Sequence, residues 1–302
     1  MEQLCLFGIP QIILGDYHRA IKKGDWESLP GIILSLDEPG NRPSGWQKKK
    51  LFWEKELVRI RENEDRSPTE MASYWEKILS DFPDEELKPE LDDMQGYWFG
   101  RLTKKLKDED FSYLTENIHP SFCLLKIGRY HEASQKALRY LNETGENAQL
   151  RTYQSFCFDK LRMKREALTA LTFALFFDPL SVDVAFVFSK EIREVYETLR
   201  TRDADPRLAR VKWPLECWLE RLADIPLEKE FAERMAARYQ GSFLTKDPRT
   251  EFDAQIYFNH LLYIAEVTRQ KTHVVDSELL DIRNRMKDIN GKAFRRYMKS
   301  IL

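Results

Sequence analysis

The spacing of apolar residues along the chain predicts a succession of amphipathic helices. Leu29, Ile32, Ile33 and Leu36 recur at intervals of three and four residues, the spacing of one buried helix face. Comparable patterns predict helices that end at about Lys23 and that cover about 27–36, the segment from Trp46 to Ile60, about 67–81 and about 91–107. No segment alternates apolar and polar residues in the manner of a strand, so we expect an all-α fold without significant β-sheet.

Capping residues and prolines indicate where some of these helices begin and end. Ser67-Pro68-Thr69-Glu70 predicts a helix start, because Ser67 can cap, Pro68 suits the first turn and Glu70 completes a capping box. In the second half, three Asp-Pro pairs at 178–179, 205–206 and 247–248 each predict the end of one helix and the start of the next.

The most informative feature is an internal repeat. Ser121-Phe122-Cys123 recurs 34 residues later as Ser155-Phe156-Cys157, and six of the thirteen positions from 121 to 133 are identical at this offset. The identical positions further along pair Lys126 with Lys160, Glu132 with Glu166, Ala133 with Ala167 and Leu141 with Leu175. A period near 34 residues is typical of a stacked helical hairpin.

These residues resemble the tetratricopeptide repeat family over about 115–180. The segment from Gly128 to Ala133 is similar to that family's turn and the start of its second helix, and Pro179 to its closing proline. The second copy departs from the pattern at Arg162, which replaces the turn glycine, and at Lys164, which replaces the aromatic residue. Pro120 within the first helix of the first copy predicts that this helix is short or kinked. The resemblance implies a superhelix of stacked hairpins, flanked by irregular helices.

Two hairpins need further helices to close their core. We expect a helix from about Ser181 to Arg200 to stack on the second hairpin. Its predicted buried row is Val184, Ala185, Phe188, Ile192, Val195 and Leu199.

The resemblance also implies a concave groove lined by the first helix of each hairpin. The expected groove residues are Phe122, Lys126, Tyr153, Phe156 and Lys160. An apolar floor beside positive charges would accept an extended peptide or a helix that carries acidic groups. In the alternative interpretation, the two Phe residues fill space between hairpins and the two Lys residues are solvated.

The repeat suggests a division of the chain into three parts. These are 1–110, irregular helical hairpins that hold five of the seven Trp residues; 111–200, the repeats with the following helix; and 201–302, a C-terminal helical region. We interpret the Trp residues mainly as core, because large aromatic side chains dominate burial.

Composition limits the remaining choices. The formal net charge is −2, which gives no argument for nucleic acid or an anionic membrane as a partner of the whole chain. Cys5, Cys123, Cys157 and Cys217 form no C-x-x-C pair, so we expect reduced thiols, buried at the two repeated positions. We find no signal peptide and no apolar run long enough to span a membrane, and we expect a cytoplasmic protein without a membrane partner.

A local excess of positive charge follows at the C-terminus. From 282 to 302 there are seven basic residues and one acid, interrupted by Asn290-Gly291, which predicts two short helices with a basic face. The basic residues are Arg283, Arg285, Lys287, Lys292, Arg295, Arg296 and Lys299. Either this is a polar cap for the helical stack, or it binds nucleic acid or an acidic partner.

No motif for catalysis, metal or cofactor binding is found: the five His residues form no metal pair, and G-x-S-x-G, G-x-G-x-x-G and P-loop patterns are absent. We therefore expect no catalytic residues, no metal and no cofactor. The leading hypothesis is a protein-interaction or adaptor protein that is not an enzyme. The alternatives are a nucleic-acid-binding helical repeat, and an all-α enzyme whose site is assembled from distant residues.

Overall fold

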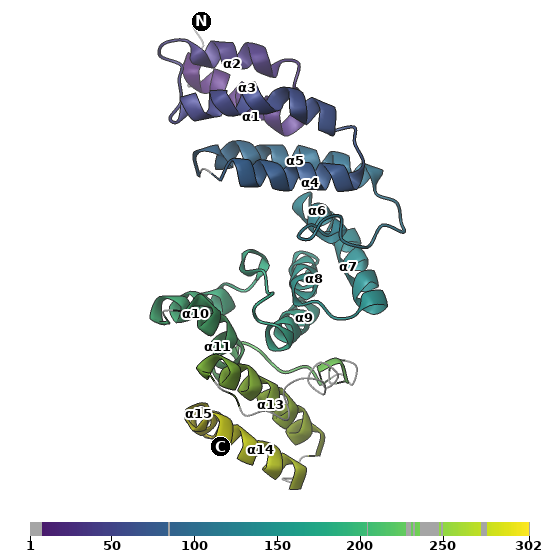
Figure 1. The fold of residues 1–302 in the computed structure, drawn as a ribbon, viewed down its shortest axis with the longest axis vertical. Helices are drawn as coiled ribbons and strands as arrows, with labels where there is room; N and C mark the ends of the chain where they lie inside the picture. Colours follow the sequence, from purple (N-terminus) through teal and green to yellow (C-terminus); the bar gives the residue numbers. More distant parts are fainter. Residues whose placement is uncertain are drawn as a thin grey trace, which may run out of the picture. The chain divides into compact units, whose positions relative to one another are not determined.

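A computed structural model describes residues 8–83, 85–203, 205–227, 231, 233–235, 248, 250–272 and 277–301. In these ranges the regular structure is helical and no strand occurs, which confirms the all-α prediction (Figure 1). The chain divides into two compact units, residues 1–136 and 137–302, each described below by itself.

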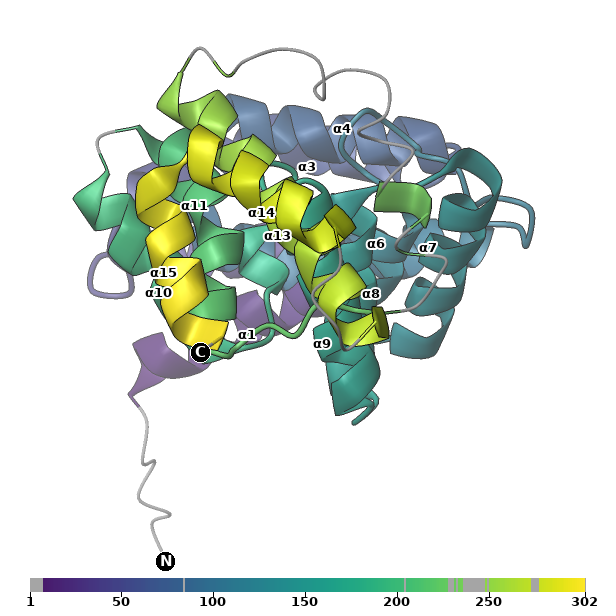
Figure 2. The same cartoon turned by 90° about the horizontal axis from the view of Figure 1, so that it is seen from below.

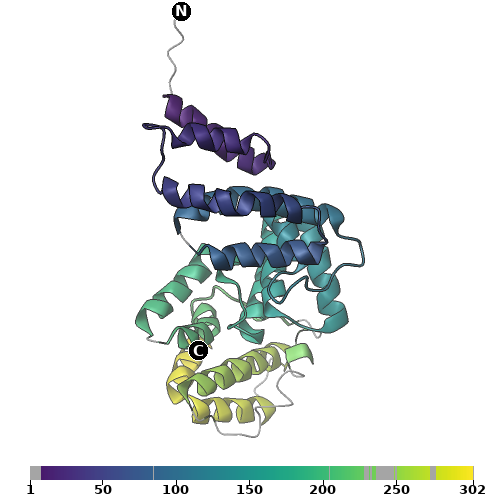
Figure 3. The same ribbon diagram turned by 45° about the horizontal axis from the view of Figure 1, so that its top comes forward.

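The first unit is built from pairs of helices in chain order (Figure 3, purple to blue). They are α1 (Ile9–Lys23), α2 (Leu29–Asp37), α3 (Trp46–Asn63), α4 (Pro68–Asp81), α5 (Lys88–Lys105) and α6 (Pro120–Lys126), with a 3₁₀ turn at Glu85–Leu87. The capping box of Ser67 and Glu70 is present at the start of α4, as predicted. Helix α5 begins before the expected residue 91, because Pro89 lies in its first turn, where no backbone N–H is needed.

Tryptophan side chains form much of the core of this unit. All five of its Trp residues are buried, which confirms their interpretation as core. The indole Nε1 of Trp53 donates to the hydroxyl of Tyr17 at 2.6 Å. Nearby, Lys49 Nζ donates to Glu90 Oε1 at 2.7 Å inside the same core. The burial of these polar groups is therefore offset by directed hydrogen bonds.

The second unit starts within α7 (Tyr130–Thr144), which crosses the boundary between the units. It continues with α8 (Ala148–Lys160), α9 (Lys164–Phe177), a 3₁₀ turn at Val184–Phe186, α10 (Lys190–Arg202), α11 (Pro206–Leu219), α13 (Glu251–Thr272), α14 (Ser277–Ile289) and α15 (Gly291–Ile301) (Figure 2). Asp205 caps α11 as expected, whereas Asp247 of the third Asp-Pro pair lies outside the described residues.

The predicted helix from 181 to 200 is wrong in its first half. Asp183 accepts a hydrogen bond from the amide of Ala185 and starts only a single 3₁₀ turn. Ser189 then caps α10 by accepting from the amide of Ile192 at 3.2 Å. These caps compete with a continuous helix, and Phe186 packs on Tyr153 instead of joining a helical stripe. The expected row therefore survives only from Ile192 onward.

Small buried side chains let α8 and α9 approach closely. Ser155 and Cys157 on α8 and Ala167 on α9 are all fully buried. Ser155 Oγ also donates to the carbonyl oxygen of Ala167 at 2.8 Å, which ties the two helices together. A larger residue at 167 would have to displace this contact.

We therefore expect Ala167→Leu to lower the free energy of unfolding by about 1–3 kcal/mol through overpacking. The measurement is a urea unfolding curve followed by circular dichroism. Glu166→Leu adds the same side chain at the neighbouring exposed position and should change stability by no more than about 0.5 kcal/mol. Equal effects of the two substitutions would contradict the close approach at Ala167.

The turns of the two repeat copies share an unusual backbone conformation. Gly128 has a φ of +80°, and Arg162, at the same place in the second copy, has a φ of +64°. Left-handed backbone strains an L side chain but not glycine. Arg162 therefore replaces the glycine of the first copy, but the backbone of the turn keeps the same left-handed conformation.

Two substitutions test this strain in opposite directions. Arg162→Gly should raise the free energy of unfolding by about 0.5–1 kcal/mol, and Gly128→Ala should lower it by about 1 kcal/mol. A Cβ at Gly128 would meet only the Tyr130 hydroxyl, at 4.0 Å, so its effect would be conformational. Thermal or urea unfolding of the full chain measures both, and shifts of the same sign would refute the assignment.

Candidate binding surface

The two repeat copies place identical residues in equivalent environments. At every identical pair the burial class is the same in both copies. The buried pairs are Ser121 and Ser155, Cys123 and Cys157, Ala133 and Ala167, and Leu141 and Leu175; the exposed pairs are Lys126 and Lys160, and Glu132 and Glu166; Phe122 and Phe156 are half-buried. The identity at 34 residues therefore coincides with the same degree of burial at each of these positions.

In both copies the repeated Lys lies over the ring of the repeated Phe. Lys126 Nζ is 5.4 Å from the centre of the Phe122 ring, and Lys160 Nζ is 4.8 Å from that of Phe156. Residues four apart share one face of a helix, and a cation over an aromatic face is held by the ring quadrupole. Each copy thus presents a half-exposed ring with a positive charge beside it.

The inner edges of these rings are anchored in the cores. Phe122 meets Phe99 of α5 edge to face, with ring centres 5.6 Å apart. Phe156 meets Phe186 in the same manner at 5.5 Å. The rings therefore both pack and face solvent, so the two interpretations offered by the sequence are each partly right for the phenylalanines.

Tyr153 differs from the other expected groove residues. Its side chain is only 2% exposed and its ring packs against Phe186. Its hydroxyl donates to Asp183 Oδ2 at 3.3 Å and accepts from Gln149 Nε2 at 3.0 Å. Tyr153 is a packing residue here, and we leave it out of the candidate surface.

The Phe–Lys pairs belong to different compact units: Phe122 and Lys126 to the first, Phe156 and Lys160 to the second. Each pair is a site on its own helix. The shared concave groove stays a prediction.

The repeated cysteines are buried thiols, as expected. Burial raises the pKa of Cys157 to about 12 and also raises the pKa of Cys123. A thiol with a raised pKa is protonated at neutral pH and is a poor nucleophile. These residues therefore serve the helix contact. Cys5 lies outside the described residues.

A buried histidine at the start of α6 escaped the sequence analysis. His119 Nε2 donates to the carbonyl oxygen of Phe111 at 2.6 Å, so Nδ1 accepts from the Ser121 hydroxyl at 2.7 Å and from its amide at 3.1 Å. Burial lowers the pKa of His119 to about 4. The neutral ring thus caps the helix that carries Phe122. Its position just before Pro120 was the available signal, since Pro favours the first helical turn.

This geometry predicts a pH-dependent stability. Between the usual pKa of 6.5 and the folded pKa of about 4, the unfolded chain binds a proton that the folded chain excludes. The contribution of His119 is therefore complete above pH 6.5 and is lost as the pH falls towards 4, by at most about 3 kcal/mol. In urea unfolding at several pH values, His119→Asn should flatten this loss, whereas the same change at exposed His131 should leave it intact. An unchanged slope in His119→Asn would contradict the assignment.

The basic C-terminal residues lie on α14 and α15, the two short helices that the sequence predicted. Three of the seven make contacts within the fold. Arg296 donates to both carboxylate oxygens of Glu216, at 2.5 and 2.6 Å, and the Arg283 guanidinium lies 5.8 Å from the centre of the Tyr297 ring. Exposed positions are held by Arg285, Lys287, Lys292, Arg295 and Lys299. Arg285 also approaches the hydroxyl of Tyr257 at 3.5 Å.

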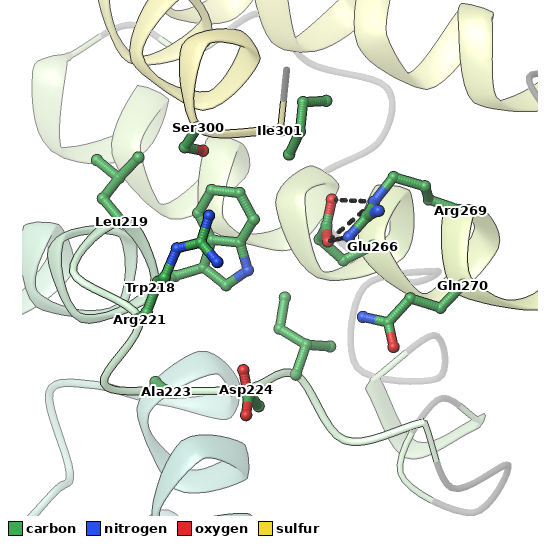
Figure 4. A pocket seen from close by; sticks show the side chains of 11 residues that line it. Trp218, Leu219, Arg221, Ala223, Asp224, Glu266, Arg269, Gln270, Ser300 and Ile301 are labelled. Atoms are coloured by element: carbon green, nitrogen blue, oxygen red, sulfur yellow. Dashed lines mark hydrogen bonds and ion pairs between the residues drawn. The ribbon is translucent and has the colours of Figure 1, made fainter.

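A pocket of about 280 Å³ in the second unit contains a buried carboxylate (Figure 4). Glu266 is 1% exposed and accepts from Arg269 Nη2 at 2.6 Å and from the Tyr297 hydroxyl at 3.0 Å. Burial, reinforced by this carboxylate, raises the pKa of Tyr297 to about 12. Glu266 is thus neutralised by a two-point ion pair with Arg269.

Across the described ranges, no three His, Cys, Asp or Glu side chains converge to hold a metal ion. None of the helices in those ranges combines the length and the apolar character needed to cross a bilayer. Comparisons with protein-family models, with curated proteins and with solved structures give no match.

The sequence analysis also overlooked the turn between α8 and α9. Leu161 and Met163 are exposed there, at 37% and 39%, between the cations Lys160, Arg162 and Lys164. The signal was present in the sequence Lys-Leu-Arg-Met-Lys-Arg at 160–165. It was interpreted only as a departure from the repeat pattern.

Proposed function

We propose that this chain is a protein-interaction or adaptor protein with tetratricopeptide-like hairpins, which binds an acidic peptide or helix of a cytoplasmic partner through its Phe–Lys pairs. The observation that carries the proposal is that both copies hold a half-exposed Phe beneath a Lys, at 5.4 and 4.8 Å. The neighbouring Cys123 and Cys157 are, by contrast, fully buried.

The pair suits a partner that carries both apolar and acidic side chains. The exposed part of the ring offers apolar contact, and the Lys ammonium can pair with a carboxylate at the edge of that contact. Among the described residues, the one carboxylate that pairs with Lys160 is that of Asp159, at the long distance of 3.9 Å. Binding would therefore give up little internal ion pairing.

The alternative role in nucleic-acid binding receives less support from the C-terminal residues. Arg296 is engaged by Glu216, and Arg283 lies over Tyr297, so the seven cations do not act as one free set. Glu220 also lies beside Glu216 in a cavity of about 380 Å³ that includes Glu191 and Glu194. These four carboxylates would repel a phosphate backbone near Arg296.

The proposal is tested by capture of partners from native cytosol with the tagged full chain. A variant with Phe156→Ala and Lys160→Glu should capture the partner about tenfold less well, because interface aromatic residues contribute most to binding. Leu138→Ala with Arg139→Glu is the matched control, since it removes an exposed apolar side chain and reverses a charge on α7.

Circular dichroism must show that both variants are folded. Loss of the same partner in the control variant would mean a general effect of charge. Equal capture by all three proteins would remove the Phe–Lys pair from the binding surface.

A further inference from the structure

The turn between α8 and α9 concentrates positive charge that the fold leaves unpaired. Four of the six residues from 160 to 165 are basic. Lys160 lies over Phe156, but the side chains of Arg162, Lys164 and Arg165 have no hydrogen-bond or ion-pair partner in the described part of the chain. The first copy differs here: Arg129 Nε donates to Glu132 at 2.6 Å.

Three features of this turn work against local stability. Arg162 occupies left-handed backbone where the first copy has Gly128. Lys164 and Arg165 stand in the first turn of α9, where the helix dipole disfavours positive charge. The N-terminus of α9 also lacks a side-chain cap, because Met163 occupies the N-cap position and its side chain accepts no hydrogen bond from the free amides. Glu166 is the acidic residue of the first turn of α9, so the two cations there outnumber the one carboxylate that the dipole favours. Local costs of this kind are concentrated at recognition sites.

Exposed apolar side chains lie among these charges. Leu161 is 37% and Met163 is 39% exposed, and Phe156 stands one helical turn before Lys160. A surface of this kind has an apolar centre and a positive rim. Flexible Met side chains also adapt readily to a bound surface.

We propose that the α8–α9 turn, residues 160–165, is the specificity-determining part of the binding surface and selects an acidic segment that carries aliphatic or aromatic side chains. The inference rests on the proposed function and adds the turn to the Phe156–Lys160 pair. Carboxylates of the segment pair with Arg162, Lys164 and Arg165, and its apolar side chains cover Leu161 and Met163. The carboxylates of the segment also offset the repulsion among the cations, and between the cations and the positive N-terminal end of the α9 dipole.

Other anionic partners fit this turn less well. Binding to single-stranded nucleic acid uses successive aromatic platforms for stacking, whereas this surface has the one ring of Phe156 and the turn adds only Leu and Met. Anchoring at a bilayer scales with buried apolar area, and two side chains offer little. An acidic protein segment uses both the charges and the small apolar centre.

The internal repeat supplies a matched substitution. Arg162→Gly, Met163→Arg, Lys164→Tyr and Arg165→His together install the turn of the first copy, Gly128-Arg129-Tyr130-His131. The exchange keeps a backbone that this chain already forms and removes two formal charges. A control with Lys287→Gln and Lys299→Gln removes two charges from exposed positions elsewhere.

The probe is a fluorescein-labelled peptide in which Asp and Glu alternate with Leu and Phe, measured by fluorescence anisotropy with the full chain. The turn exchange should weaken binding by about tenfold or more, the control by less than about threefold, and added salt should weaken wild-type binding. The exchange should also keep or raise the urea midpoint. A purely structural turn would instead lose stability and leave affinity unchanged.

Each contrary outcome has a distinct meaning. If the exchange leaves binding intact while Phe156→Ala with Lys160→Glu abolishes it, the role of the turn is overturned and the proposed function stands. If the turn exchange abolishes binding but Phe156→Ala with Lys160→Glu does not, the role of the turn is supported and that of the Phe–Lys pair is not. Absence of binding by the wild type, or turn-dependent binding only to anionic phosphatidylserine vesicles or to RNA, overturns the inference.

Discussion

The close approach of α8 and α9 is the constraint on which the candidate surface depends. On α8, Ser155 and Cys157 must be buried for Ala167 to reach them, and both are. The residue between them, Phe156, then stands at the margin of the contact, half in the core and half outside. Lys160 follows one helical turn later and meets the ring. The position of the Phe–Lys pair is therefore a consequence of packing on its neighbours.

Charge is handled in two different ways in the second unit. Inside the core, Arg151 donates to both oxygens of Glu146, at 2.8 and 2.6 Å, and to Gln154 at 2.8 Å. Its guanidinium carbon also lies 5.0 Å from the centre of the Phe231 ring. An unpaired charge there would be strongly destabilising, and each of the three nitrogens of Arg151 donates a hydrogen bond. At the α8–α9 turn, by contrast, solvent screens the cations, and Arg162, Lys164 and Arg165 have no partner among the described residues.

The helices and the repeat could be predicted from the sequence because both depend on local signals. The period of apolar residues and the capping box at Ser67 act within a few residues, and the structure follows them. The start of α10 could not be placed in the same way. Residues 184–188 suit a helix by composition, but Asp183 and Ser189 cap separate turns, and Phe186 is drawn towards Tyr153 across the unit. The conformation of residues 184–188 is therefore set by a tertiary contact and not by local helix propensity.

The candidate site was predictable only in part, for a related reason. Spacing predicted that Phe156 and Lys160 share a helix face, but it gave no measure of how deep Tyr153 lies. Tyr153 is buried because Phe186, far along the chain, covers its ring. The charges of the turn were visible in the sequence, but the contacts of each charge were not. Arg129 and Arg165 occupy comparable turns, yet Arg129 pairs with Glu132 and Arg165 has no partner among the residues that the structure describes.

The comparison of the two copies also shows where information about binding lies. Identical positions such as Ser155, Cys157 and Ala167 are mostly those that the helix contact fixes. The positions that are identical in the two copies therefore indicate mainly which residues pack between helices, and not which residues bind a partner. The turn differs at five consecutive positions while its backbone keeps a positive φ, at +80° in Gly128 and +64° in Arg162. The two turns share a backbone conformation but differ in the charge of their side chains, and this difference alters what each surface can bind. In the second copy it comes with the conformational strain of a non-glycine residue at position 162.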